Sequence, residues 1–176
     1  MQAKNKEIIF DGAGFKAESI CVQQFGGKLL SDKESQYKDI DALIESEKHG
    51  SSYTVSIKDQ LWSSEKYGCI QIEQKLINTR NNKSDVGCFY KSEAQYYFWR
   101  VFTKEMGDTW LILDRNVLKQ YLLDNAATLK TWATRPTTEA KNRSFNRYYD
   151  RTEGVMIPVT TLLTIGRSIP VSKEIH

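Results

Sequence analysis

Three short stretches in the first half of the chain alternate apolar and polar residues with a period of two. They are KDIDALIES at 38–46, YTVSIKDQL at 53–61 and CIQIEQKLI at 69–77. This period is typical of β-strands, because successive side chains of a strand point to opposite faces of a sheet. The short polar stretches EKHGSS and, after Trp62, SSEKYG separate the three segments. The pattern therefore predicts an antiparallel meander of three strands.

Further helices and strands are predicted on both sides of this meander. Helical spacing of apolar residues before two glycines predicts a helix over about 15–25. The segments AQYYFWRVF and TWLILD are rich in aromatic and β-branched residues and predict two strands around the turn KEMGD. NVLKQYLLDNA predicts a helix capped by Asp114 or Asn116. GVMIPVTTLLTIG predicts a closing strand followed by a turn or short helix.

Length and composition indicate a globular protein. The 176 residues, 40% of them hydrophobic, can build one domain with a real core. We predict a single domain over 1–176, with a core over about 15–125 and a basic C-terminal extension over about 130–176. The net charge of +3 permits a nucleic-acid partner without requiring one.

The cysteines and the hydropathy of the chain indicate the cellular compartment in which the protein is expected. Cys21, Cys69 and Cys88 have no CxxC spacing, and the chain has only two histidines, which argues against a zinc site. No stretch approaches the ~20 apolar residues of a membrane span, and the N-terminus has no apolar h-region. We expect a cytoplasmic protein with reduced thiols.

One predicted face of the meander gathers charged and polar side chains. Water-facing strands explain such a face in many proteins, but here acids and lysines recur at the same depth on neighbouring strands, where side chains lie ~5 Å apart. Clustered carboxylates repel each other unless a cation joins them. Mg²⁺ prefers one or two carboxylates, water and phosphate oxygens, and a nearby lysine can stabilise developing negative charge. The pattern favours metal-assisted phosphodiester cleavage and comprises Asp39, Asp41, Ser56, Lys58, Gln60, Gln71, Glu73 and Lys75.

The order of four segments resembles the PD-(D/E)xK nuclease superfamily, and more narrowly its small phage-type nucleases. KAES in the first helix is followed by KDIDALI, TVSIKDQ and IQIEQK, and the resemblance covers about residues 15 to 125. It implies an α/β (α+β) fold of the restriction-endonuclease type, with a mixed central β-sheet flanked by helices. It also implies a magnesium-dependent endonuclease or other hydrolase acting on DNA, with Mn²⁺ as an alternative cofactor.

Two assignments of the signature compete. In one, Glu73 and Lys75 form the (D/E)xK pair and Asp41 is the leading aspartate. In the other, which we favour, Ser56 and Lys58 fill that place and Glu73 supplies the carboxylate from an adjacent strand. The second assignment has the shorter gap from the aspartate, but Ser56 stands where the superfamily has an acid. Asp41 and Glu73 belong to both assignments.

Several further residues are candidates for the same site. The resemblance places Glu18, on the first helix, among the metal ligands with Asp41 and Glu73, although a solvated helix acid explains Glu18 equally well. Asp39 shares the predicted face of Asp41 and is the alternative leading aspartate. Gln60 is a candidate for positioning a water or a phosphate, although an exposed strand-end residue is the simpler interpretation.

Two aromatic segments invite comparison with nucleic-acid-binding surfaces. YYFWR at 96–100 fits core packing better than base stacking, given its strand spacing. The segment 135–151 interleaves basic and aromatic residues, which suits phosphate contact and stacking on unpaired bases. A solvated loop explains it equally well. The DNA-binding candidates there are Arg135, Lys141, Arg143, Arg147 and Arg151.

The sequence is also compatible with two other functions. Because Ser56 replaces an acid, the chain fits a nucleic-acid-binding protein that has lost cleavage. A protein-interaction or inhibitor module is the third class. The expected partner is DNA, and no association with a membrane is expected. The sequence leaves open whether the protein forms a homodimer. A phage-encoded protein of this kind would act in the host cytoplasm.

Overall fold

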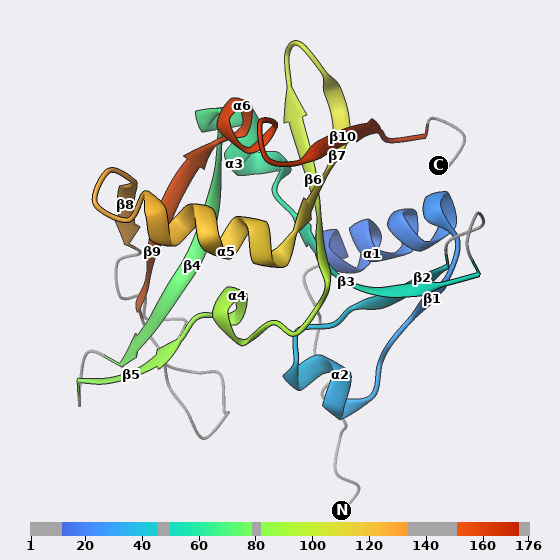
Figure 1. The fold of residues 1–176 in the computed structure, drawn as a ribbon, viewed down its shortest axis with the longest axis horizontal. Helices are drawn as coiled ribbons and strands as arrows, with labels where there is room; N and C mark the ends of the chain where they lie inside the picture. Colours follow the sequence, from blue (N-terminus) through green and yellow to red (C-terminus); the bar gives the residue numbers. More distant parts are fainter. Residues whose placement is uncertain (1–11, 46–49, 79–81, 134–150, 173–176) are drawn as a thin grey trace, which may run out of the picture.

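A mixed β-sheet with flanking helices organises the molecule (Figure 1). The computed structural model describes residues 12–45, 50–78, 82–133 and 151–172. Within them the larger sheet has six strands in the order β1-β2-β3-β6-β7-β10, of which β3 and β6 are parallel and all other neighbours antiparallel. The fold class expected from the sequence is confirmed. These strands are β1 Lys28–Leu29, β2 Ala42–Glu45, β3 Ser52–Asp59, β6 Tyr96–Thr103, β7 Gly107–Asp114 and β10 Arg167–Pro170.

A second, antiparallel sheet packs beside the first. Its order is β5-β4-β9-β8, and its long central pair joins β4 with β9. The local sequence patterns do not indicate this sheet, because its strands come from distant parts of the chain: β4 Cys69–Asn78, β5 Lys83–Val86, β8 Lys130–Ala133 and β9 Arg151–Pro158.

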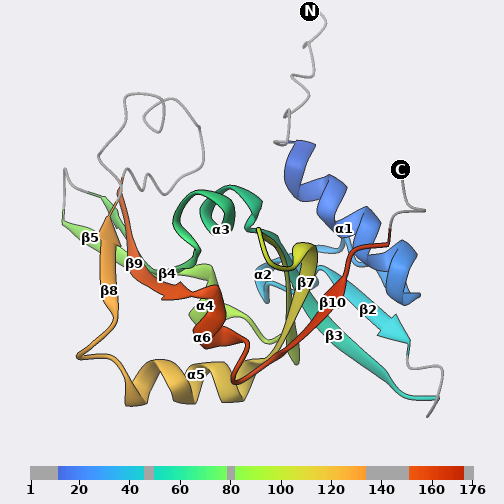
Figure 2. The same ribbon diagram turned by 90° about the horizontal axis from the view of Figure 1, so that it is seen from above.

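Two apolar cores hold the layers together. Helix α1 (Gly12–Phe25) covers one face of the six-stranded sheet, where Ile20 and Cys21 pack with Val55 and Ile57. The opposite face packs against the second sheet and helix α5 (Arg115–Asp124). In Figure 2, α1 (blue) lies beside β2 and β3, whereas β8 and β9 lie on the other side of the molecule.

The remaining helices are short connections. None of the helices in the described ranges combines the length and the apolar character that crossing a membrane requires. Helix α5 is capped by Asp114, one of the two predicted caps, whose carboxylate accepts from the N–H groups of Asn116 and Val117. The short helices are α2 Lys33–Tyr37, α3 Leu61–Tyr67, α4 Cys88–Lys91 and α6 Val159–Leu162.

The predicted three-strand meander is wrong in its third strand. β2 and β3 pair antiparallel, but the other neighbour of β3 is β6, and β4 belongs to the second sheet. The segment predicted as a turn is helix α3, which ends at Gly68 in the left-handed conformation (φ 64°). Its polar Ser64 is buried and accepts from the N–H of Phe102. A helix between two strands carries the chain to another layer, so no hairpin forms.

Strand β3 is buried on both faces. Val55, Ser56 and Ile57 in succession are all buried, so the polar side of the alternation faces the second sheet and not water. The aromatic run in β6 packs in the core as predicted, with Tyr97, Phe98 and Trp99 buried.

Candidate active site

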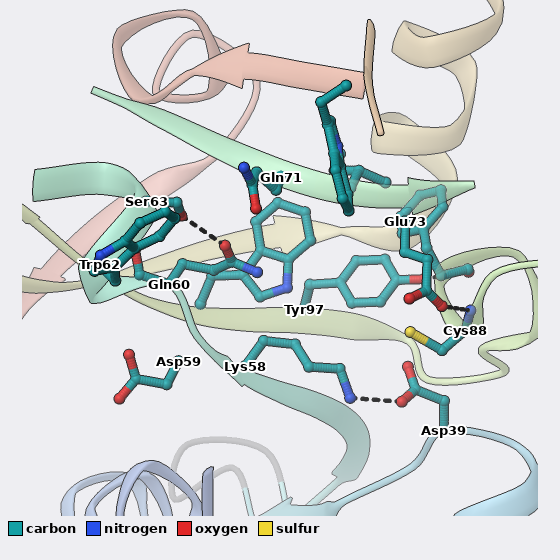
Figure 3. Close-up of a pocket in the computed structure, with 14 residues that line it drawn as sticks. Asp39, Lys58, Asp59, Gln60, Trp62, Ser63, Gln71, Glu73, Cys88 and Tyr97 are labelled. Carbon is teal, nitrogen blue, oxygen red and sulfur yellow. Dashed lines mark hydrogen bonds and ion pairs between the residues drawn. The ribbon is translucent and has the colours of Figure 1, made fainter. Parts of the chain in front are cut away.

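The ammonium group of Lys58 lies between two aspartates. Its Nζ donates to Asp39 Oδ1 at 2.6 Å and lies 3.6 Å from Asp41 Oδ2. Figure 3 shows the Lys58 side chain reaching along β3 toward Asp39. Asp39 also accepts from the buried hydroxyl of Ser56 at 2.8 Å. Ser56 and Lys58 are two residues apart on one strand and therefore share a face, so both reach the same carboxylate.

Asp39 lies in the turn before β2 and not on a strand as predicted. Its φ of 52° is in the left-handed region, which aspartate tolerates better than most residues. Its backbone carbonyl accepts from Ser92 Oγ at 3.3 Å. This local conformation, together with its bonds to β3, directs the carboxylate toward Lys58.

Asp41 binds the backbone of β3. Its Oδ2 accepts from the N–H of Ile57 at 2.6 Å, so the side chain replaces a strand partner there. Burial raises the pKa of Asp41 above its usual value, although the Lys58 ammonium and this N–H oppose the shift. The other carboxylate oxygen, Oδ1, has no hydrogen bond to a described residue.

Glu18, on α1, belongs to the same electrostatic neighbourhood. Burial and the charge of Asp41 raise the pKa of Glu18, while Lys58 opposes the shift. Its carboxylate forms no hydrogen bond with another described residue. Glu18 and Asp41 therefore each keep an oxygen that could bind a cation.

Lys58 carries a stable positive charge. Burial lowers the pKa of its ammonium, but Asp39 and Asp41 raise it by more, so the pKa lies above its usual value. At neutral pH the group is a cationic donor and not a general base. The three carboxylates around this one lysine have an excess of negative charge.

Glu73 faces this cluster from the second sheet. Its Oε1 accepts from the N–H of Cys88 at 3.1 Å. Gly87 permits this approach, because a Cβ there would lie 2.3 Å from the Glu73 carbonyl oxygen. Cys88 is exposed as a residue, but desolvation of its thiol and the neighbouring Glu73 carboxylate raise its pKa to about 12, so the thiol is neutral at physiological pH and is not an activated nucleophile.

A cavity of about 460 Å³ lies between the Lys58 cluster and Glu73 of the second sheet. Asp39 and Lys58 line it on one side and Glu73 on the other, as Figure 3 shows. Gln60 also lines it; its Oε1 accepts from Ser63 Oγ at 2.9 Å, and it precedes α3. The cavity also has aromatic walls that include Trp99 and Trp132. Trp99 belongs to the run YYFWR, whose spacing predicts core packing, and no sequence pattern singles out Trp132 as its neighbour in this cavity, because the two strands are distant along the chain.

Other predicted residues lie elsewhere. Lys75 is exposed on β4 and lines a different cavity, beside Asp85 and Glu153. Arg151, at the start of β9, forms an ion pair with Glu153 at 2.7 Å. The other DNA-binding candidates, Arg135, Lys141, Arg143 and Arg147, lie outside the described residues.

The donor set limits how a metal ion could bind. Among the described residues, no group of three or more His, Cys, Asp or Glu side chains is arranged to hold a metal ion. Mg²⁺ commonly takes one or two carboxylates and completes its shell with water and phosphate. A site with so few carboxylates would draw on the oxygens of Asp41 and Glu18 that form no hydrogen bond with a described residue, since Ser56 and Lys58 occupy both oxygens of Asp39.

Comparisons with known proteins give little further information. No family model and no curated protein matches the chain. Among solved structures, the chain is similar to a bacterial homing endonuclease, with a TM-score of 0.43 and 18% identity over 62% of this chain and 71% of that one. A similarity at this level does not bear on activity.

Proposed function

We propose that the protein is a metal-dependent deoxyribonuclease of the PD-(D/E)xK type, which hydrolyses DNA phosphodiester bonds. The observation that carries the proposal is the Lys58 ammonium, held by Asp39 and Asp41 beside an open cavity. The cluster uses the favoured assignment of the signature, with Ser56 and Lys58 on β3 and Asp41 just before β2.

Each residue has a distinct role in this proposal. Lys58 donates to the scissile phosphate, where a fixed cation stabilises the charge that develops in the transition state. Asp39 is a positioning residue, because its carboxylate holds Lys58 and Ser56. Asp41 and Glu18 supply the oxygens for a metal ion, and Glu73 faces the substrate from the opposite wall.

The charge of the cluster supports a divalent cation. Burial raises the pKa values of both carboxyls, and repulsion adds to it, from Asp41 on Glu18 and from Asp39 on Asp41. A bound cation would relieve both effects. When bound, Mg²⁺ or Mn²⁺ would neutralise phosphate charge and promote ionisation of the attacking water.

DNA contact by the basic segment 135–151 is a separate part of the proposal. If Arg143 and Arg147 hold phosphates, changing both to Ala weakens DNA binding and reduces its log-log salt slope by roughly 0.9 for each duplex phosphate that is no longer neutralised. Titrations at several salt concentrations measure that slope, and an unchanged slope would leave the segment without a role in binding.

Ser56 favours a second candidate function. Its hydroxyl stands where the superfamily has a metal-binding acid, and it is fully buried against Asp39. A nucleic-acid-binding protein that has lost cleavage would retain the rest of the cluster. Calorimetric titration of the protein with Mg²⁺ and Mn²⁺ distinguishes the nuclease from the binding protein, because only the nuclease requires a bound metal ion.

The direct test is incubation of the purified protein with plasmid and with linear single-stranded DNA. We expect cleavage with Mg²⁺ or Mn²⁺ and none with EDTA. Cleavage that Lys58→Ala leaves unchanged would assign the activity to another site or a contaminant. If no cleavage occurs, salt-dependent DNA binding supports the binding protein, and its absence would contradict both candidates.

A further inference from the structure

The cavity beside Lys58 has walls of two chemical kinds. Tyr97 and Trp99 from β6 and Trp132 from β8 give it aromatic surface, and Gln60 and Gln71 give it amide groups. Its volume of about 460 Å³ is in the range of small-molecule pockets, roughly 300–1,000 Å³. Of its lining, the proposed nuclease function uses Asp39, Lys58 and Glu73.

One polar group in this wall has no partner. The indole Nε1–H of Trp99 is buried and has no hydrogen bond among the described residues, and the side chain is 3% exposed. Buried donors are nearly always paired in native proteins, so an unpaired one calls for an explanation. Because an indole N–H can only donate, the missing partner is a hydrogen-bond acceptor.

The aromatic side chains of the cavity differ in exposure. Tyr97 and Trp99 are buried, and Tyr97 packs against Phe89 and Trp99 with ring centroids 5.1 Å and 5.5 Å apart, so they form the floor. Trp132 is half-buried and is fixed by its Nε1–H, which donates to the Val155 carbonyl at 3.1 Å. Its ring is therefore the one on which a nucleobase would stack, an interaction with little dependence on sequence.

The amides supply polar contacts for the edge of a base. The Oε1 of Gln60 accepts from Ser63, which leaves its NH₂ group as a donor. Gln71 lies on β4 across the cavity, as Figure 3 shows. A planar ligand between these residues would have its attached phosphate within the charged side of the same cavity, where Lys58 lies.

We propose that this cavity binds one unpaired nucleobase, which accepts a hydrogen bond from Trp99 Nε1 while its phosphate faces Lys58. That the base belongs to a DNA strand rests on the proposed nuclease function. The same chemistry would also accept a free mononucleotide. The protein would then act on single-stranded or locally opened DNA, since a paired and stacked base cannot enter a pocket.

Tryptophan fluorescence in EDTA tests the inference without catalysis. The ligands are the four deoxynucleoside monophosphates, a short single-stranded oligodeoxynucleotide and deoxyribose 5-phosphate. We expect at least one nucleotide and the oligonucleotide to quench the fluorescence, and deoxyribose 5-phosphate to bind at least about fivefold more weakly because it cannot stack. Equal binding of deoxyribose 5-phosphate would overturn the base site.

Two variants test the named contacts. Trp99→Phe keeps a ring but removes the N–H, and should weaken nucleotide binding roughly three- to tenfold, the loss of one hydrogen bond. Gln71→Met, which keeps the side-chain length, should weaken nucleotide binding by a similar factor. It provides the test if Trp99→Phe does not fold. Trp110→Phe, whose indole bonds Gln24 in the other core, is the matched control. Unchanged affinity in both cavity variants would overturn the proposal.

The two proposals fail in different ways. Metal-dependent cleavage by a protein that binds no nucleotide in EDTA would overturn the base site and leave the nuclease intact. Nucleotide binding without cleavage would support the base site and contradict the nuclease. Binding of mononucleotides but not of the oligonucleotide would identify a free nucleotide as the ligand and overturn the link to a DNA strand.

Discussion

Strands β3 and β4 carry similar sequence patterns, yet they offer very different chemical environments. In β3, Lys58 is enclosed by Asp39 and Asp41 beside the cavity. In β4, Lys75 is exposed and faces another cavity. Both lysines follow an apolar-polar alternation, so the alternation does not rank them, and in the sequence only the shorter gap from the aspartate favours Lys58. The difference teaches that position relative to the acids, and not spacing along the strand, selects the candidate lysine.

The largest expected effect separates the two lysines. Lys58→Ala should reduce the rate of metal-dependent DNA cleavage by at least ~100-fold, comparable to losing one electrostatic donor to a transition state. Lys75→Ala should cost far less, because Lys75 faces another cavity, and any effect should be on KM more than on kcat. Single-turnover cleavage kinetics measure both. The reverse order would move the signature to Glu73 and Lys75.

A glycine of the second sheet tests the opposite wall. Gly154 pairs with Glu73, and a Cβ there would lie 2.0 Å from the Ile72 carbonyl oxygen and 2.8 Å from Trp132 Nε1. Gly154→Ala should lower the free energy of unfolding by about 1–3 kcal/mol, because the backbone must shift. Urea denaturation measures it. Gly50→Ala is the control, since its Cβ would meet open space and the cost is only that of its positive φ. Equal losses at the two glycines would mean that Gly154 is not tightly packed.

On β3, Ser56 tests how firmly Asp39 is held. Ser56→Ala removes the hydrogen bond to Asp39 and should lower the free energy of unfolding by about 1 kcal/mol. Ser168→Ala, at an exposed position of β10, should change it by less. A neutral or stabilising Ser56→Ala would indicate that Asp39 is held by Lys58 alone.

The smallest effect concerns Asp41 and depends on pH. Because the folded protein raises the pKa of Asp41, it holds this proton more tightly than the unfolded chain does. The charged form therefore destabilises the fold at neutral pH, and this effect disappears as the pH falls below the ordinary aspartate range.

Asp41→Asn should thus stabilise the protein in EDTA by a few tenths to about 1 kcal/mol at neutral pH, with no gain in acid. The variant should also lose metal-dependent cleavage. Thermal unfolding at several pH values, with the exposed Asp124→Asn as control, measures the difference. Full nuclease activity in Asp41→Asn would transfer the leading role to Asp39.

The sequence by itself determined the local structure of much of the chain. Helical spacing before two glycines located α1, the cap of α5 was narrowed to Asp114 or Asn116, and the aromatic run in β6 was correctly assigned to the core. These features depend on residues close together along the chain, where backbone geometry and side-chain periodicity act directly.

Only the tertiary structure decided which of these elements meet. The composition of the stretch that forms helix α3 is typical of a turn, because its buried residues are serines. This helix leads β4 into a second sheet, where Glu73 faces β3 across a cavity. The parallel pairing of β3 with β6 brings Lys58 beside Trp99. Long-range pairing depends on how whole layers bury their apolar faces, and no short segment encodes that choice.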